Sequence, residues 1–454
     1  MGEQDTGRTA ALYVASAVVV AAAVVGTLLV PLAIVVVFGV VAFTALAAWK
    51  PKVVSPLLLV IAIPLMRPNV LSEQFALVAT ALVVLAAVVA FADDRGRATI
   101  PRPLVIVTLI TLGMSVWLLV VSSMFGLGSV PDIARGIVTT SGTLAAASLV
   151  LGEPKRRRFV VRSFVWIVLA MSASYVITAL IWAVIGVGSA AVATFQINTN
   201  APATVYFPFT VTFGSTGVLG QSVPRFTGLG REPGWMALYA GSALLLWPTL
   251  YRPRVLPALI LLAGLLGTTS TAGFGALVVV LVGAWLIRPN TRGDMFTRYV
   301  AVLFKLTLLA GAVYLAIYAP VLGFAAKGDV NAVSLGERST ATQAGIQSLS
   351  SSLVGGDDSG IQNSINLIAA LAPFGLPFFA LVTLAIFLPL RRQPGASRSL
   401  PVAVLVFITL LLSQPAAAST FAFMLIGIAT LAAKDHATLT PSGASQREAL
   451  LLHP

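Results

Sequence analysis

The residues best suited to do chemistry in this chain are arginines that lie in polar stretches between apolar ones. The segment Pro224-Arg-Phe-Thr-Gly-Leu-Gly-Arg-Glu-Pro-Gly-Trp235 holds Arg225 and Arg231 close to Glu232. A guanidinium is always charged, and its planar fork binds phosphate oxygens in pairs. We therefore interpret the two arginines as ligands of an anionic group and Glu232 as a catalytic base.

A structural role is the alternative for the same segment. Pro233 suits the first position of a helix, because its missing N–H would be unpaired there anyway. Glu232 would then lie at the N-cap, where the helix dipole favours an anion, and would pair with Arg231. Both interpretations remain open at the level of the sequence.

A second polar stretch holds the other candidates. It contains Arg338 and ends in Leu353-Val-Gly-Gly-Asp-Asp-Ser-Gly-Ile-Gln-Asn-Ser-Ile-Asn-Leu367. Amide side chains suit a hydroxyl-rich ligand, although they also cap helix ends. Two adjacent aspartates without other clear ligands are weak evidence for a metal ion, so no metal site is predicted. We interpret five residues of this stretch as substrate-binding: Arg338, Asp357, Asp358, Gln362 and Asn363.

A short hydroxyl-rich segment, Thr268-Thr-Ser-Thr-Ala-Gly-Phe-Gly275, separates two apolar stretches. It is either a tight turn between two helices or a polar lining for the same site. Both interpretations fit its composition.

Composition indicates the class of protein that carries these groups. Hydrophobic residues make up 58% of the chain and charged residues 9%, against about 45–50% and 25% in soluble domains. The net charge of +13 comes in short runs such as Lys155-Arg-Arg-Arg158 and not as one patch. Anionic lipid headgroups are therefore favoured over nucleic acid as the partner. Cysteine is absent, and the two histidines, His436 and His453, are close to the C-terminus.

The apolar segments predict an all-α fold, a polytopic transmembrane helical bundle of about 12–14 spans, since a spanning helix needs about 20 apolar residues. Placing the basic runs inside puts both termini in the cytoplasm. Of the 28 Lys and Arg, about 21 are then cytoplasmic and roughly six remain outside: Arg67, Arg135, Arg225, Arg231, Lys327 and Arg338. Cations on the outer side favour an anionic extracytoplasmic ligand.

Two long extracytoplasmic loops divide the predicted chain, and outer loops longer than about 12–15 residues are more often functional than connective. No soluble domain is expected. The predicted parts are N-terminal transmembrane helices (1–187), the loop with the Arg-Glu-Pro element (188–234), transmembrane helices with the polar hinge (235–323), the second loop (324–364), C-terminal transmembrane helices (365–433) and a cytoplasmic tail (434–454).

Together these elements resemble the O-antigen polymerase and O-antigen ligase superfamily of bacterial membrane glycosyltransferases. The likeness rests on order and context over roughly residues 215–390. An Arg-x-x-Gly-x-x-x-Glu-Pro element enters a helix, as Arg225 to Pro233 does here, and a Ser/Thr-Gly hinge follows. A long outer loop then carries an arginine, here Arg338, and ends in glycine-rich and amide-rich stretches before Phe374-Gly-Leu.

The resemblance implies glycosyl transfer on the extracytoplasmic face of the bacterial cytoplasmic (inner) membrane. The donor would be a polyprenyl-diphosphate-linked oligosaccharide and the acceptor a sugar hydroxyl, with no cofactor and no metal ion. Arg225, Arg231 and Arg338 would bind the diphosphate, and Glu232 would activate the acceptor. Membrane lipid and a chain-length regulator are the further partners to expect.

One departure from the family pattern favours a polymerase over a ligase. Ligases of this family typically carry a histidine in the outer loop near the place of Gln362 and Asn363, and this chain has none there. Transfer of finished glycan to a lipid or protein acceptor, as in a ligase, remains the first alternative. A lipid-linked-sugar flippase or transporter is the second, and it would need a polar path through the membrane.

Overall fold

The computed structural model describes residues 50–66, 74–94, 96, 99–127, 130–196, 202–218, 221–228, 232–287, 295–318, 332–357, 366–391, 393, 395–417 and 419–439. The apolar hairpin expected before residue 50 lies outside these ranges, as do Arg67, Lys327 and the tail after residue 439.

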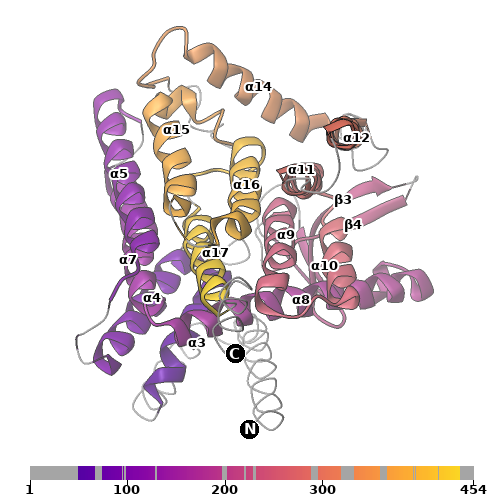
Figure 1. Cartoon of the computed structure of the whole chain (residues 1–454), viewed down its shortest axis with the longest axis horizontal. Helices are drawn as coiled ribbons and strands as arrows, with labels where there is room; N and C mark the ends of the chain where they lie inside the picture. The colour runs from indigo at the N-terminus through magenta and orange to yellow at the C-terminus, as the bar shows by residue number, and fades with distance from the viewer. Residues whose placement is uncertain are drawn as a thin grey trace, which may run out of the picture.

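Helices make up most of the described part of the chain (Figure 1), which agrees with the predicted helical class. Those before residue 190 are α3 (Pro51–Leu65), α4 (Gln74–Asp93), α5 (Arg102–Phe125), α6 (Val130–Ile137), the π-helical turn η1 (Val138–Gly142), α7 (Thr143–Val150), α8 (Pro154–Ile185) and the 3₁₀ turn η2 (Gly188–Ala190). Those after residue 232 are α9 (Pro233–Leu250), α10 (Val255–Gly267), α11 (Thr271–Ile287), α12 (Met295–Tyr318), α14 (Ala332–Ser348), α15 (Leu371–Phe387), the 3₁₀ turn η4 (Leu388–Leu390), α16 (Ala396–Leu412) and α17 (Thr420–Leu439).

Three described helices are long and apolar enough to cross a membrane: α5, α8, and α15 together with η4. The 24 residues of α5 extend over about 36 Å at 1.5 Å per residue, more than the hydrocarbon thickness of about 30 Å. Some other apolar helices are shorter, such as α10 with 13 residues. By length and composition the chain is a membrane protein.

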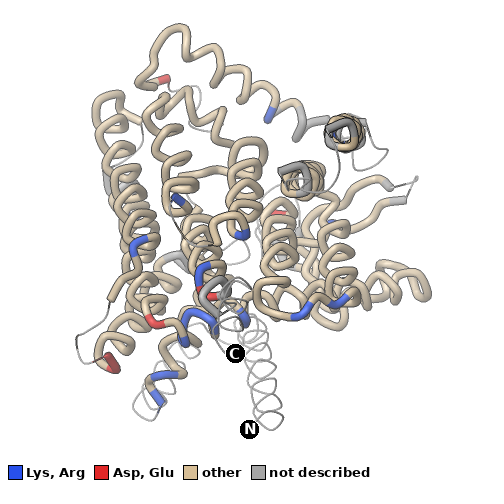
Figure 2. Tube along the Cα trace, in the orientation of Figure 1, with Lys and Arg blue, Asp and Glu red and all other residues tan. Residues whose placement is uncertain are grey.

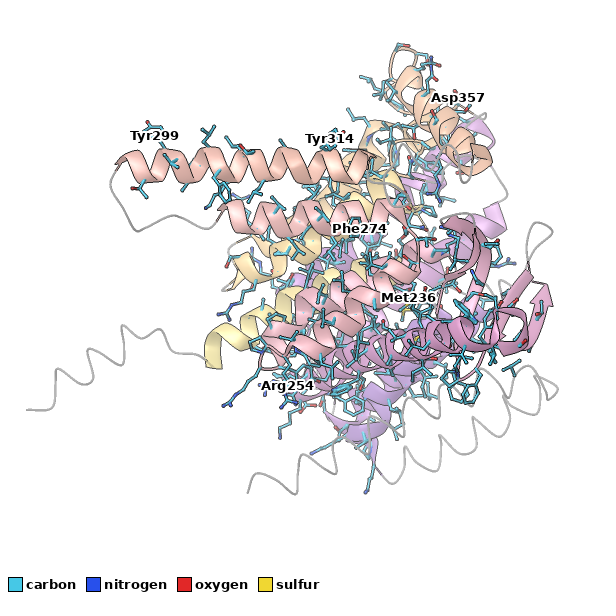
Figure 3. All side chains as sticks on the ribbon, turned by 90° about the vertical axis from the view of Figure 1, so that its right-hand side faces the viewer. Met236, Arg254, Phe274, Tyr299, Tyr314 and Asp357 are labelled. Atoms are coloured by element: carbon cyan, nitrogen blue, oxygen red, sulfur yellow. The ribbon has the colours of Figure 1, made fainter. Side chains whose placement is uncertain are left out.

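The described helices do not share one axis. In Figure 1, α5 and α15 run upright, α8 lies across them at the bottom, and α11 and α12 are seen end-on. The view turned by 90° shows α12 lengthwise at the top, with Tyr299 and Tyr314 on it (Figure 3). The described helices therefore do not form a single parallel bundle.

A small antiparallel sheet corrects the all-α prediction. Its strands occur in the order β1 (Ala191–Gln196), β2 (Pro202–Tyr206), β3 (Thr210–Val218) and β4 (Gln221–Phe226). It occupies most of the predicted outer loop 188–234. Threonine, valine and aromatic residues favour strands, and Thr204 pairs with Thr194 on one side and Thr212 on the other. The strands are short and joined by turns. Gly, Asn and Pro therefore interrupt the alternation of side chains that would indicate strands in the sequence.

The sheet packs against the second half of α8. The Thr178 hydroxyl donates to the carbonyl of Phe207 at 2.7 Å, and the hydroxyls of Ser174 and Thr210 lie 2.9 Å apart. Tyr175 stacks on Phe226, the last residue of β4, with ring centroids 4.9 Å apart. These contacts fix the end of β4, which leads into the candidate site.

Buried ion pairs hold the first turns of α8. Arg156 contacts Asp93, Asp94 and Glu153, the last at 3.1 Å, and Arg157 binds Asp435 of α17 at 2.8 Å. Both arginine side chains are almost wholly buried. Half of the basic run Lys155–Arg158 therefore binds other parts of the chain, and its remaining members are exposed.

Hydroxyl pairs join the helices of the N-terminal part. Thr80 on α4 bonds Thr143 on α7 at 2.8 Å, and Ser115 on α5 bonds Ser141 on η1 at the same distance. All four residues are buried. Hydrogen bonds of this kind hold membrane helices together.

Candidate functional site

Three of the predicted site residues come together from distant parts of the chain. Arg225 is the penultimate residue of β4, Glu232 directly precedes α9, and Arg338 lies on α14. Three polar partners complete the group, which we name the arginine–glutamate cluster: Arg225, Glu232, Arg338, Thr269, Ser413 and Gln414. The helices beneath it, α9, α11 and α16, pack against one another.

Arg225 is held by the polar hinge between α10 and α11. Its Nε donates to the Thr269 hydroxyl at 3.2 Å. Thr269 has φ of 47°, a left-handed conformation that is costly for a β-branched residue. The Thr268 hydroxyl shapes the turn by donating to Leu265 and accepting from the N–H of Ser270. The segment is thus a tight turn between helices, and it also contacts a predicted site residue.

Glu232 occupies the N-cap position of α9, and the helix begins at Pro233 as predicted. Its side chain makes no hydrogen bond to the first turn. Instead, Glu232 Oε2 accepts from Nε2 of Gln414 at 3.1 Å. Glu232 therefore has the N-cap position of the structural alternative without a side-chain cap, and its expected partner Arg231 lies outside the described residues.

Gln414 is a member of the cluster that the sequence interpretation missed. It is fully buried, and its Oε1 has no hydrogen-bond partner among the described residues. A buried acceptor left unpaired costs about 1–3 kcal/mol, so this oxygen is suited to receive a donor from a ligand. The available signal was Ser413-Gln414-Pro415, a polar break between two apolar segments.

Gly234 brings the start of α9 close to this break. A Cβ at Gly234 would collide with the Gln414 amide and would lie 3.2 Å from the Ser413 hydroxyl. The glycine of the Glu-Pro-Gly sequence therefore permits the contact between Glu232 and Gln414.

Arg338 reaches the cluster from α14. Its Nη1 donates to the Ser413 hydroxyl at 3.4 Å, a long bond. Residues four and seven positions further on lie on the same helix face. There the Thr342 hydroxyl accepts from Asn366 at 3.1 Å, and Gly345 lies against the Ile368 carbonyl. The second predicted loop thus contains a helix, which docks on the turn before α15 and presents Arg338.

The cluster carries an excess of positive charge in a poorly solvated place. The pKa of Arg225 is lowered to about 10, mainly by burial and next by the positive charge of Arg338, while Glu232 opposes the shift. Arg225 remains charged at neutral pH. With two guanidiniums and one carboxylate close together, a bound anion would relieve both the repulsion and the lost solvation.

Asp357 lies apart from this cluster. It is exposed and follows two glycines with positive φ, Gly355 and Gly356, whose loop pairs with the start of α15 through Gly356 N–H and the Pro373 carbonyl at 3.0 Å. Figure 3 places Asp357 near the top of the molecule, well above Met236 in the first turn of α9. The glycines therefore serve a close backbone contact.

The remaining candidates, Arg231, Asp358, Gln362 and Asn363, lie outside the described residues. Their neighbour Asn366 is described, and its amide is used within the fold. Its Oδ1 accepts from the N–H of Ala369 at 2.7 Å, and its Nδ2 donates to Thr342. This member of the amide-rich stretch positions α14.

The cluster has the groups needed to bind a phosphate-bearing ligand beside a carboxylate that can accept a proton. Among the described residues, no three His, Asp or Glu side chains gather as metal ligands would. Comparison with protein-family models and with curated proteins gives no match for this chain.

Proposed function

We propose that the chain is a polytopic enzyme of the bacterial inner membrane, with about 12–14 spans, that polymerises cell-surface polysaccharide on the extracytoplasmic face. It transfers a glycan from a polyprenyl-diphosphate-linked oligosaccharide onto the sugar hydroxyl of an acceptor. The proposal depends above all on one observation. Three elements bring Arg225, Arg338 and Glu232 to one place: Arg225 bonds Thr269, Arg338 bonds Ser413, and the adjacent Gln414 bonds Glu232.

The chemistry requires two events that this arrangement suits. The acceptor oxygen attacks the anomeric carbon, and its proton passes to the Glu232 carboxylate. The bond between that carbon and the diphosphate oxygen breaks, and the leaving diphosphate keeps the electron pair. Arg225 and Arg338 stabilise the charge that grows on it.

The distribution of charge among the described residues supports the proposed orientation. Most Lys and Arg positions lie in the lower half of Figure 2, and α14 lies at the top. Basic residues concentrate on the cytoplasmic side of membrane proteins. We therefore assign the lower side to the cytoplasm, with α14 and Arg338 facing outward.

The transport alternative needs hydroxyl-lined helices around a path. Serines and threonines do line α4, α5 and α7, but they are buried or half-buried and bond to one another. That arrangement joins helices. It favours the enzyme over the transporter.

The test is a reaction of the purified full-length chain with a short lipid-diphosphate-linked repeat as donor and acceptor, without nucleotide or added metal. The wild-type chain should produce a ladder of longer products. Glu232→Gln should lower kcat by about 10²–10⁴-fold, because general-base catalysis contributes that much, while the KM for the donor stays in the same range.

The matched control is Arg135→Ala, which removes an exposed cation of α6 outside the cluster. It should leave the ladder unchanged, whereas Arg225→Ala should remove it. Transfer that appears only after a lipid or protein acceptor is added would identify a ligase instead. Full activity in Glu232→Gln would exclude Glu232 as the base.

A further inference from the structure

A second cationic site lies at the other end of α9. A cavity of about 470 Å³ is bounded by the early turns of α8, the C-terminal end of α9 with the turn after it, and the end of α17. Its charged lining residues are Arg157, Arg158, Arg162, Arg252 and Asp435. Glu232 is at the opposite end of the 18-residue helix, so about 27 Å separates the cavity from the arginine–glutamate cluster.

The arginines that line this cavity carry more positive charge than its carboxylate neutralises. Among the described residues, Asp435 is the single carboxylate in the lining, and it is held by Arg157 through contacts at 2.8 and 2.9 Å. Arg158 and Arg252 are exposed. Arg162 is half-buried, and its Nε is buried without a hydrogen-bond partner among the described residues. A ligand with negatively charged oxygens would satisfy these donors.

Aromatic rings stand directly beside the arginines. The Arg162 guanidinium lies 5.8 Å from the centre of the Tyr251 ring. Tyr251 packs against Trp247 at 4.7 Å and against Trp166 at 6.1 Å, and Trp166 is 40% exposed. Tryptophan and tyrosine gather at the level of lipid headgroups. Apart from Thr249, the remaining lining is apolar and includes Val161, Leu250 and Ala432.

We propose that this cavity binds the phosphate headgroup of an anionic phospholipid, with its acyl chains along the neighbouring apolar surface. A free phosphate ion would use the same arginines but would gain nothing from the aromatic and apolar walls. Basic pockets between membrane helices on the cytoplasmic side take such headgroups. The bound lipid would tie α8, α9 and α17 together at this end.

The test counts lipids bound to the detergent-purified full-length chain by native mass spectrometry. Phosphatidylglycerol should bind in a saturable way, and zwitterionic phosphatidylcholine should bind far less. Arg162→Gln combined with Arg252→Gln should weaken phosphatidylglycerol binding by about 25-fold, since each arginine near the membrane surface contributes about fivefold.

Arg254→Gln is the matched control. Arg254 is also exposed, two residues after Arg252, but it does not line the cavity (Figure 3 labels it at the lower end). It should bind lipid as the wild type does. If the double variant Arg162→Gln and Arg252→Gln unfolds, the double variant Arg158→Gln and Arg252→Gln, which changes two exposed residues, provides the same test.

Two results would overturn the proposal. The first is equal phosphatidylglycerol binding by the wild type and both pairs of variants. The second is displacement of the lipid by inorganic phosphate at millimolar concentration, which would identify a site for the free ion.

Discussion

Arg225 is a buried cation, and its proposed binding role comes at the expense of stability. A base whose pKa is lower in the folded chain than in the unfolded chain binds its proton less tightly when folded. The unfolded chain therefore holds more protons between the lowered pKa of about 10 and the higher, ordinary pKa of an arginine. Across that window stability rises with pH, and at neutral pH the charged arginine destabilises the fold.

Replacing this arginine by a neutral residue separates binding from stability. Arg225→Gln should abolish binding of a short-chain polyprenyl diphosphate and leave the thermal unfolding temperature at pH 7 unchanged or higher. Calorimetry and thermal unfolding in detergent measure the two effects. Arg135→Gln should alter neither. A large fall in unfolding temperature for Arg225→Gln would show that the guanidinium is mainly structural.

The same residue gives a pH-dependent prediction. Lysine has an ordinary pKa about two units below that of arginine, and the same burial and the same neighbour Arg338 would lower it further. The Arg225→Lys variant should therefore lose its cation, and with it catalytic efficiency, at a lower pH than the wild type. The measurement is kcat/KM of the transfer reaction from pH 7 to 10. Coincident profiles would contradict a charge-based role for Arg225.

At the scale of elements, α14 decides whether Arg338 reaches the cluster. Its face with Arg338, Thr342 and Gly345 docks on the turn before α15, and a Cβ at Gly345 would collide with the Ile368 carbonyl, which is backbone and cannot rotate away. A displacement of about 1 Å in a catalytic site can cost 10²-fold in rate.

Gly345→Ala should therefore move α14 and lower kcat/KM for the lipid-linked donor by about 10²-fold. Gly336→Ala on the same helix is the control, because Gly336 is exposed and a Cβ there meets no atom within 4 Å. Steady-state kinetics of both variants measures the difference. Equal activity would show that the position of Arg338 does not matter for the reaction.

At the scale of the whole molecule, ion pairs at the start of α8 join parts of the chain that are far apart in sequence. Arg156 contacts Asp93 at the end of α4, the adjacent Asp94, and Glu153, and Arg157 reaches α17. Breaking a buried pair by removing one partner costs about 3–5 kcal/mol, because the other charges lose their counter-charge. These contacts therefore govern how the N-terminal and C-terminal helices assemble.

Arg156→Met should accordingly lower the free energy of unfolding by about 3–5 kcal/mol. Lys155→Met changes the adjacent exposed residue and should shift the free energy of unfolding by no more than about 0.5 kcal/mol. Thermal unfolding of both variants in the same detergent is the measurement. If the two variants unfold at the same temperature, the pairs with Asp93 and Asp94 contribute nothing to stability.

The sequence alone determined the helical class and the membrane character, because both depend on local apolar composition. It also determined the start of α9, since Pro233 acts locally through its missing N–H. It selected Arg225, Glu232 and Arg338 as candidates by residue type and order. It did not determine the strand alternation of residues 191–226 or the helical state of residues 332–348, where polar composition is equally typical of loops.

Only the tertiary structure decided which side chains meet. It joins Glu232 to Gln414, a residue 182 positions away, and it separates Asp357 from the arginines although both had been assigned to one substrate. It also buries Arg156 and Arg157, which the sequence shows only as members of a short basic run. The physical reason is common to all three cases. Local patterns report how much surface each segment must bury, whereas the partner of a polar side chain depends on how distant segments pack.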